Sequence, residues 1–160
     1  MPKPLRSWLY GLHRIEDAAL VLALMSMLGL AVTQIILRNG FDNGFLWAES
    51  FLRILVLWVA ILGAMVATRE NNHINIDAVS RYMPLKSQSV LFVITRIFAA
   101  LVCGTVAWYA IELVQIEYED QTRAFAEVPT WVCQLILPFG FAVMSLRFAI
   151  DVIKALVPQR

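Results

Sequence analysis

Four long apolar runs, separated by short polar segments, set the pattern of this chain. They cover residues 18–37, 45–67, 90–114 and 129–150. Each run contains about 20 residues or more, and an α-helix of that length crosses a hydrocarbon core of about 30 Å. The pattern therefore predicts an all-α membrane protein with four transmembrane helices. Four spans in 160 residues leave no room for a soluble domain, so we expect a single four-helix membrane domain over residues 1–160.

Basic residues in the short connecting segments predict the orientation of these spans. Most of them lie before the first span, after the second or after the fourth: Lys3, Arg6, Arg14, Arg69, Arg81, Lys86, Lys154 and Arg160. The other two loops hold one arginine each, Arg38 and Arg123. Because Lys and Arg concentrate on the cytoplasmic side of membrane proteins, we expect both termini in the cytoplasm.

Two shorter segments have the pattern of helices lying at the cytoplasmic surface. Near the N-terminus, apolar residues recur at helical spacing while the basic residues fall largely elsewhere: Leu5, Trp8, Leu9, Leu12 and Ile15. This predicts a short amphipathic helix in the headgroup plane, before the first span. In the loop after the second span, Asp77 is placed to cap another short helix that Pro84 ends.

Small residues recur about four positions apart on the second and third spans. They are Ala60, Gly63, Ala64 and Ala67 on the second, and Ala100, Cys103, Gly104 and Ala107 on the third. Such spacing lets helix backbones approach closely, and packing drives helix association in lipid. These rows therefore indicate faces at which helices touch.

Composition agrees with a membrane protein. Hydrophobic residues make up 60% of the chain and charged residues 16%, against about 25% charged in ordinary soluble domains. The formal net charge of +1 indicates no nucleic-acid partner.

Two opposite charges interrupt the second run, in the stretch FLWAESFLRILVLW over residues 45–58. Glu49 and Arg53 are four residues apart, so in a helix they lie on one face and can pair. A charge at the bilayer centre costs about 2.5–3.5 kcal/mol, but this pair lies nearer the outer end of the span. Three interpretations stay open: an intrahelical ion pair near the outer interface, a polar contact to another membrane subunit, or a site on a proton or substrate path.

Two further arginines lie near the cytoplasmic ends of spans. Arg96 is in the third span and Arg147 is in the fourth. Both side chains are long enough to reach the interface by snorkelling, and either can then contact lipid phosphates.

Several classes of chemistry are excluded by residue placement. His13 and His73 both fall at the predicted cytoplasmic surface, so no haem is ligated within the helices. Cys103 lies about 15 Å below the outer end of the third span, whereas Cys133 lies at the outer end of the fourth. A disulfide needs Cα atoms within about 7 Å, which argues against a thiol oxidase. We find no catalytic triad, zinc spacing or phosphate-binding glycine loop, and expect no enzyme activity, no cofactor and no metal.

An ordered set of motifs resembles one transporter family. The run WAESFLRILVLWVAILGAMVATRENNHINID contains a Trp-x-Glu…Arg start to a helix, a later Trp and Gly, and a His-Ile-x-Ile-Asp loop: Trp47, Glu49, Arg53, Trp58, Gly63, His73, Ile74, Ile76 and Asp77. Arg38 and the later Pro129, Trp131, Pro138, Gly140 and Arg147 add to it. The set resembles the DctQ family, the small integral-membrane subunits of TRAP transporters. Ser50 and Asn72 depart from it, standing where many members have an acidic residue and a glycine.

The resemblance implies a subunit of a bacterial, sodium-coupled secondary transporter in the inner membrane. In that family a periplasmic binding protein delivers an organic anion, a carboxylate or sugar acid, to a large DctM-type membrane subunit. The small subunit packs beside the large one and anchors its scaffold. Trp47, Glu49, Arg53 and Trp58 would then form a subunit interface or a structural ion pair, and His73 and Asp77 a cytoplasmic loop motif.

Two other functions stay open on the sequence. One is a self-contained four-helix, proton-coupled exporter acting as a homodimer, although its first span would be expected to carry a carboxylate in its apolar core and does not. The other is an anchor subunit of an unrelated membrane complex.

Overall fold

The computed structural model describes residues 3–41, 45–69, 85–125 and 127–156. Its elements are α1 (Lys3–Phe41), α2 (Leu46–Arg69), α4 (Leu85–Asp120), β1 (Arg123–Phe125), β2 (Val128–Pro129), α5 (Thr130–Gln134) and α6 (Ile136–Leu156). Within this part of the chain, four stretches are long and apolar enough to cross a membrane: His13–Gly40, Trp47–Arg69, Val90–Asp120 and Thr130–Leu156. The prediction of an all-α protein with four spans is confirmed.

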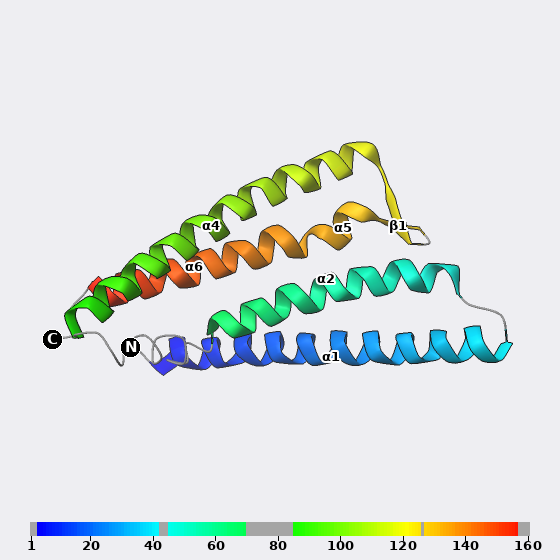
Figure 1. Cartoon of the computed structure of the whole chain (residues 1–160), viewed down its shortest axis with the longest axis horizontal. Coiled ribbons are helices and arrows are strands. Elements are labelled where there is room, and N and C mark those ends of the chain that lie inside the picture. The colour runs from blue at the N-terminus through cyan, green and yellow to red at the C-terminus, as the bar shows by residue number, and fades with distance from the viewer. Residues whose placement is uncertain (1–2, 42–44, 70–84, 126, 157–160) are drawn as a thin grey trace.

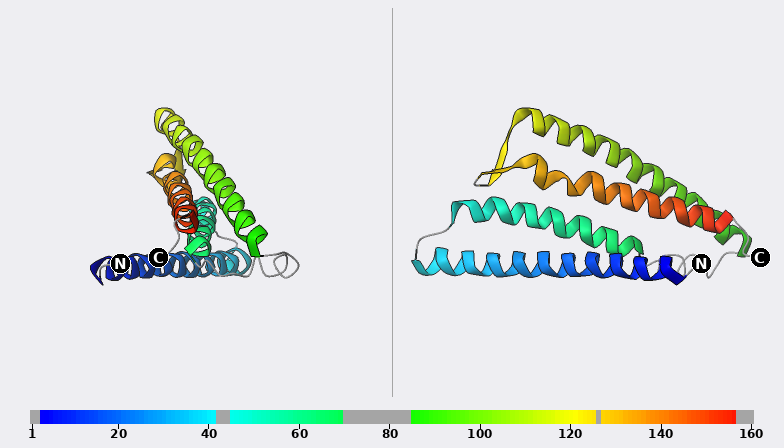
Figure 2. Two further views of the ribbon diagram at one scale, coloured as in Figure 1. Left: turned by 90° about the vertical axis from the view of Figure 1, so that its left-hand side faces the viewer. Right: turned by 180° about the vertical axis from the view of Figure 1, so that it is seen from behind.

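The long helices follow one another in space in the order α1, α2, α6, α4 (Figure 1). α1 and α4 therefore lie at opposite edges, and α2 and α6 lie between them. The start of α1 and the end of α6 lie at the same end of the molecule, while the β-hairpin lies at the other end (Figure 2). This up-and-down path agrees with termini on one side of the membrane; which side they face stays a prediction.

The core is small and lies mainly where α2 meets α6. Ile61, Leu62 and Met65 of α2 are buried there with Ile136 and Met144 of α6. The backbones come close, because a Cβ added at Gly140 of α6 would lie 2.1 Å from Cγ2 of Ile61. Most other large apolar side chains of the long helices are exposed, as expected of surfaces that face lipid or another subunit.

The contact between α4 and α6 is made by small and polar residues. Ser145 of α6 donates a hydrogen bond of 2.9 Å to the carbonyl of Ala100, and a Cβ added at Gly104 would lie 3.3 Å from its hydroxyl. The small residues of the third span thus pack against the fourth. Gly63 of α2 behaves differently, because a Cβ added there would meet nothing within 4 Å.

Two helices differ from the predicted boundaries. α1 is one helix of 39 residues, so the N-terminal segment continues into the first span rather than forming a separate short helix. Its placement in the headgroup plane stays a prediction. The fourth span is divided into α5 and α6 by a turn at Leu135. Pro138 has no N–H to donate to the carbonyl of Gln134, which explains why α5 ends there.

The segment between α4 and α5 forms an antiparallel hairpin, with Arg123 opposite Pro129 and Phe125 opposite Val128. Arg123 pairs with Glu127 at 2.9 Å across its turn. The ring of Phe125 packs edge-on against Phe51 of α2, with centroids 4.9 Å apart. The hairpin is thus held against the N-terminal part of α2.

Candidate functional site

Glu49 and Arg53 form an ion pair on the surface of α2. Glu49 lies in the first turn of the helix, and its Oε1 is 2.8 Å from an Nη atom of Arg53. The two side chains remain 70% and 77% exposed, so no other described part of the chain covers them. The N-terminal end of this membrane-crossing helix therefore presents a paired but uncovered set of charges.

Aromatic rings surround the start of α2. The rings of Phe45 and Trp47 are 5.8 Å apart, and those of Trp47 and Phe51 are 6.2 Å apart. The Gln34 side chain of α1 accepts from the Phe45 amide and donates to the Phe45 carbonyl, which fixes the entry into α2. The Glu49–Arg53 pair is consequently held on a well-anchored helix end, at the level where aromatic residues collect in membrane proteins.

The exposed charges continue into a row of small residues along α2. We call Glu49, Arg53, Val56, Ala60, Gly63 and Ala67 the α2 row. The spacings of four and three residues place them on one side of the helix. Val56 is 55% exposed, Ala60 and Ala67 are also exposed, and Gly63 is partly exposed. Neither α1 nor α6 covers this side.

Trp58 does not belong to that row. Its indole N–H donates a hydrogen bond of 2.9 Å to the carbonyl of Cys133 in α5. A tryptophan at this depth needs an acceptor for its N–H, and the break before α6 provides one. Trp58 therefore links α2 to α5 within the chain.

At the opposite end of the molecule, a charge cluster joins α1, α2 and α6. Arg147 of α6 lies 2.6 Å from Glu16 of α1 and donates a hydrogen bond of 2.5 Å to the carbonyl of Met65 in α2. The carbonyl end of a helix attracts a cation, which adds to the pairing with Glu16. Both charged side chains are mostly buried, with 20% and 16% of their surfaces exposed.

Arg69, the last residue of α2, completes this cluster. It lies 2.7 Å from Asp17 and 3.8 Å from Glu16, and it donates to the carbonyl of His13 at 3.0 Å. Two carboxylates and two guanidinium groups thus balance one another at the junction of three helices. Oε2 of Glu16 is buried without a hydrogen bond, so the balance depends on both arginines.

A further ion pair lies between α4 and α6. Arg96 is 3.8 Å from Asp151, and its guanidinium lies over the rings of Phe92 and Phe148 at 5.0 and 5.2 Å. Arg96 and Arg147 are therefore both engaged by groups of this chain. Contact of either with lipid headgroups stays a prediction.

The sequence did not reveal the acidic partners of these arginines. Glu16, Asp17 and Asp151 each lie near the same end of an apolar span as the arginine that they meet. The similar depth of each acidic residue and its arginine in the membrane was a sequence signal for pairing, but it does not show which helices are neighbours. The loop motif residues His73 and Asp77 lie outside the described residues.

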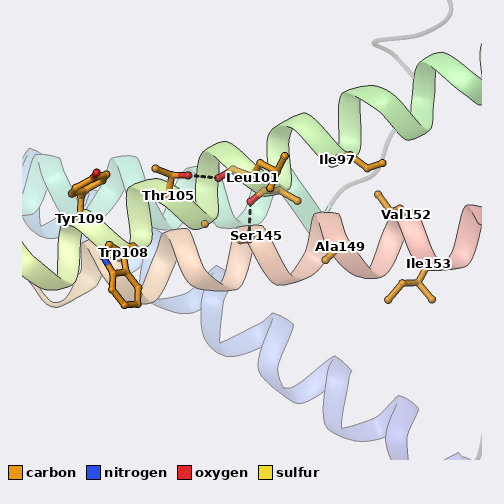
Figure 3. Close-up of a pocket in the computed structure, with 11 residues that line it drawn as sticks. Ile97, Leu101, Thr105, Trp108, Tyr109, Ser145, Ala149, Val152 and Ile153 are labelled. Atoms are coloured by element: carbon orange, nitrogen blue, oxygen red, sulfur yellow. Dashed lines mark hydrogen bonds between the residues drawn. The ribbon is translucent and has the colours of Figure 1, made fainter.

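An apolar groove of about 780 Å³ runs between α4 and α6 (Figure 3). Two of its hydroxyl groups bond to backbone carbonyls, because Ser145 donates to Ala100 and Thr105 donates to Leu101. Most of the remaining lining is aliphatic, such as Ile97 and Ile153, while Trp108 and Tyr109 add one N–H and one hydroxyl group. No charged residue lines the groove, so it has no counter-charge for an organic anion.

The fold and its polar groups define a class of protein: a multi-pass helical membrane protein whose charges lie toward the ends of its spans. Among the described residues, no group of three or more His, Cys, Asp or Glu is placed to hold a metal ion. Residues 27–157 match the family described as tripartite ATP-independent periplasmic transporters, DctQ component. The chain therefore belongs to this family and is a multi-pass inner-membrane protein. It spans less than two thirds of the length of the first curated relatives that it matches.

Similar proteins carry related names. A putative TRAP transporter small permease protein of Haemophilus influenzae is 32% identical over 108 residues, which cover 68% of this chain and 63% of that protein. The sialic acid TRAP transporter small permease protein SiaQ of Vibrio cholerae is 24% identical over 143 residues, 85% of this chain and 78% of that protein. The isethionate TRAP transporter permease protein DctMQ of Oleidesulfovibrio alaskensis is 24% identical over 106 residues, 66% of this chain but only 17% of that protein.

Proposed function

We propose that this chain is the small, non-catalytic membrane subunit of a sodium-coupled TRAP transporter. In this proposal the transporter imports an organic anion, a carboxylate or sugar acid, that a periplasmic binding protein delivers. The chain packs against the large membrane subunit and anchors its scaffold. The substrate and sodium sites lie on that larger subunit.

The distribution of charge carries this proposal. The central turns of all four spans, over residues 20–36, 54–68, 97–111 and 136–146, contain no charged residue. Transporters bind their substrates and coupling ions near the bilayer midplane, through polar groups. A chain without charged residues at that depth is poorly suited to carry an anion, but it is well suited to support another helical protein.

The DctMQ relative supports a larger membrane partner. The matched region makes up 17% of that protein, so a unit like this chain occurs there within a much longer permease. A unit that is covalently part of a permease in one protein is expected to pack against a separate permease chain in another.

Replacing Glu49 or Arg53 with alanine should weaken assembly more than it changes sodium affinity. Interhelical polar contacts in membranes contribute about 0.6–1.7 kcal/mol, so we expect about three- to twentyfold less large subunit bound to the variant. The half-saturating sodium concentration for uptake should stay unchanged. Alanine at Arg123 or Glu127, another exposed i,i+4 pair, is the matched control. A shift in sodium dependence with normal assembly would instead indicate a direct role in coupling.

Contacts with lipid headgroups at Arg96 and Arg147 belong to the same proposal, as does a contact through the loop motif of His73 and Asp77. The guanidinium groups of Arg96 and Arg147 would each donate to their carboxylate partner in this chain and to a lipid phosphate, since one guanidinium has five N–H donors.

Co-purification tests the proposal against the two other functions. The tagged chain is produced together with a large DctM-type permease of the same organism and solubilised in mild detergent. We expect a complex of the two chains. A stable homodimer that confers drug resistance, lost on Glu49→Gln, would favour the exporter. Binding to a membrane protein that is not a permease would favour an unrelated anchor.

A further inference from the structure

The α2 row is an open face on a helix that lies between two others. α1 and α6 both pack on other sides of α2, yet the row from Glu49 to Ala67 runs uncovered along the span. The row combines an ion pair at the outer end with small side chains toward the inner end. A partner that covers this row needs polar groups opposite Glu49 and Arg53. It also needs a backbone that can approach closely to Ala60, Gly63 and Ala67.

The exposed ion pair favours protein over lipid as the covering partner. Near the end of a span, water and lipid headgroups can hydrogen-bond to the remaining donors of Arg53 and to the second oxygen of Glu49, but they hold no fixed position. Another transmembrane helix can provide such partners at a fixed depth. Glu49 lies one turn closer to the outer end than Arg53. The matching partner therefore places a donor near the outer end and an acceptor about one turn deeper.

The glycine at position 63 also favours a partner helix on this face. Glycine in the middle of a helix is less favourable than alanine, and nothing in this chain lies within 4 Å of a Cβ added there. Intrachain packing thus gives no reason for a glycine at this position, in contrast to Gly140. A partner backbone passing close to Ala60, Gly63 and Ala67 would give one.

From these features we infer that the α2 row is the surface on which one transmembrane helix of the large permease lies. The inference rests on the proposed function and adds the face, the partner element and its chemistry. The partner helix runs along α2, brings small residues against Ala60, Gly63 and Ala67, and pairs its polar groups with Glu49 and Arg53. Trp58 is excluded from this surface, because it is bound to Cys133 within the chain.

Two other open faces serve as rivals. Ser26, Gly29 and Thr33 form an exposed row of small residues on α1, but the Thr33 hydroxyl is bonded to Gly29 and no charge lies in the row. The groove between α4 and α6 is largely apolar, and its Thr105 and Ser145 hydroxyls bond to backbone carbonyls. Neither rival carries a charged side chain, in contrast to the α2 row.

Site-specific photo-crosslinking tests the inference. A benzophenone amino acid is placed at Val56 or Ala60 in the α2 row, and at Ser26 on α1 or Ala142 on α6 as exposed controls. Each variant is produced with the tagged large permease, and only variants that co-purify with it are irradiated. We expect crosslinks to the permease from Val56 and Ala60, at least about tenfold more than from Ser26 or Ala142.

Bulky substitution gives a second readout on the same complex. Gly63→Leu meets no neighbour at its Cβ in this chain, so the isolated variant should fold and remain monodisperse. Binding of the large permease should fall by about tenfold or more, because the added side chain occupies the space of the partner backbone. Ala142→Leu, on another exposed surface, should leave binding unchanged.

The possible results separate the inference from the proposed function. If the permease co-purifies but crosslinks arise only from α1 or α6, or Gly63→Leu binds normally, the assigned face is wrong while the proposed function stands. If the unmodified chain binds no permease at all, the proposed function fails and the inference fails with it.

Discussion

Replacing Arg147 with alanine is expected to lower the stability of the isolated chain by about 3 kcal/mol, the effect of leaving a buried charge without its partner. Arg147 is held between Glu16 of α1 and the Met65 carbonyl of α2, so its loss removes contacts between three helices. Glu16 would keep only Arg69, at 3.8 Å, as a counter-charge. The free energy of unfolding can be measured by titrating the purified protein with SDS in mixed micelles.

The exposed pair on α2 provides an internal control. Arg53→Ala removes an arginine of a pair that is 70–77% exposed, and should change the stability of the isolated chain by less than about 1 kcal/mol. Adding Glu16→Gln to Arg147→Ala should restore part of the loss, because no uncompensated carboxylate remains. Equal effects of Arg147→Ala and Arg53→Ala would show that the cluster does not hold the three helices together.

Gly140→Ala is expected to destabilise the chain by about 1–3 kcal/mol, the usual effect of overpacking a core. The new Cβ would lie 2.1 Å from Cγ2 of Ile61, and a β-branched side chain has little freedom to move aside. α2 and α6 would have to separate at the point where the core is densest. The same SDS titration measures the change.

Two variants make this prediction specific. Gly63→Ala has open space around its Cβ, so it should be neutral or stabilise the isolated chain by up to about 1 kcal/mol. Ile61→Ala removes the obstructing methyl group, so adding Gly140→Ala to it should cost much less than in the native background. If Gly140→Ala and Gly63→Ala behave alike, the close approach at Gly140 is incorrect.

Run length was enough to predict the four spans, because a bilayer demands about 20 apolar residues from any helix that crosses it. The i,i+4 spacing likewise indicated that Glu49 and Arg53 can pair, since both lie on one helix. The boundaries of the helices were predicted less well. The amphipathic pattern of the N-terminal segment does not exclude that this segment and the first span form one helix, as they do in α1. The break that Pro138 causes in the fourth span was not predicted.

Contacts between different spans could not be predicted from the sequence. The partners of Arg147, Arg69 and Arg96 come from other helices, and helix order in space does not follow from hydropathy. The same limit applies to Trp58, whose acceptor is a backbone carbonyl that carries no sequence signal. The small-residue rows indicated close packing, but on α2 the corresponding face is open to a partner outside the chain.

We expect this chain to support a transporter without carrying its substrate. The most direct test is sodium-driven uptake of the substrate into proteoliposomes that contain the large permease and the binding protein, with and without this chain. Uptake should occur only when the chain is present, and the chain with the binding protein alone should give none. Full sodium-driven uptake by the large permease without this chain would contradict it.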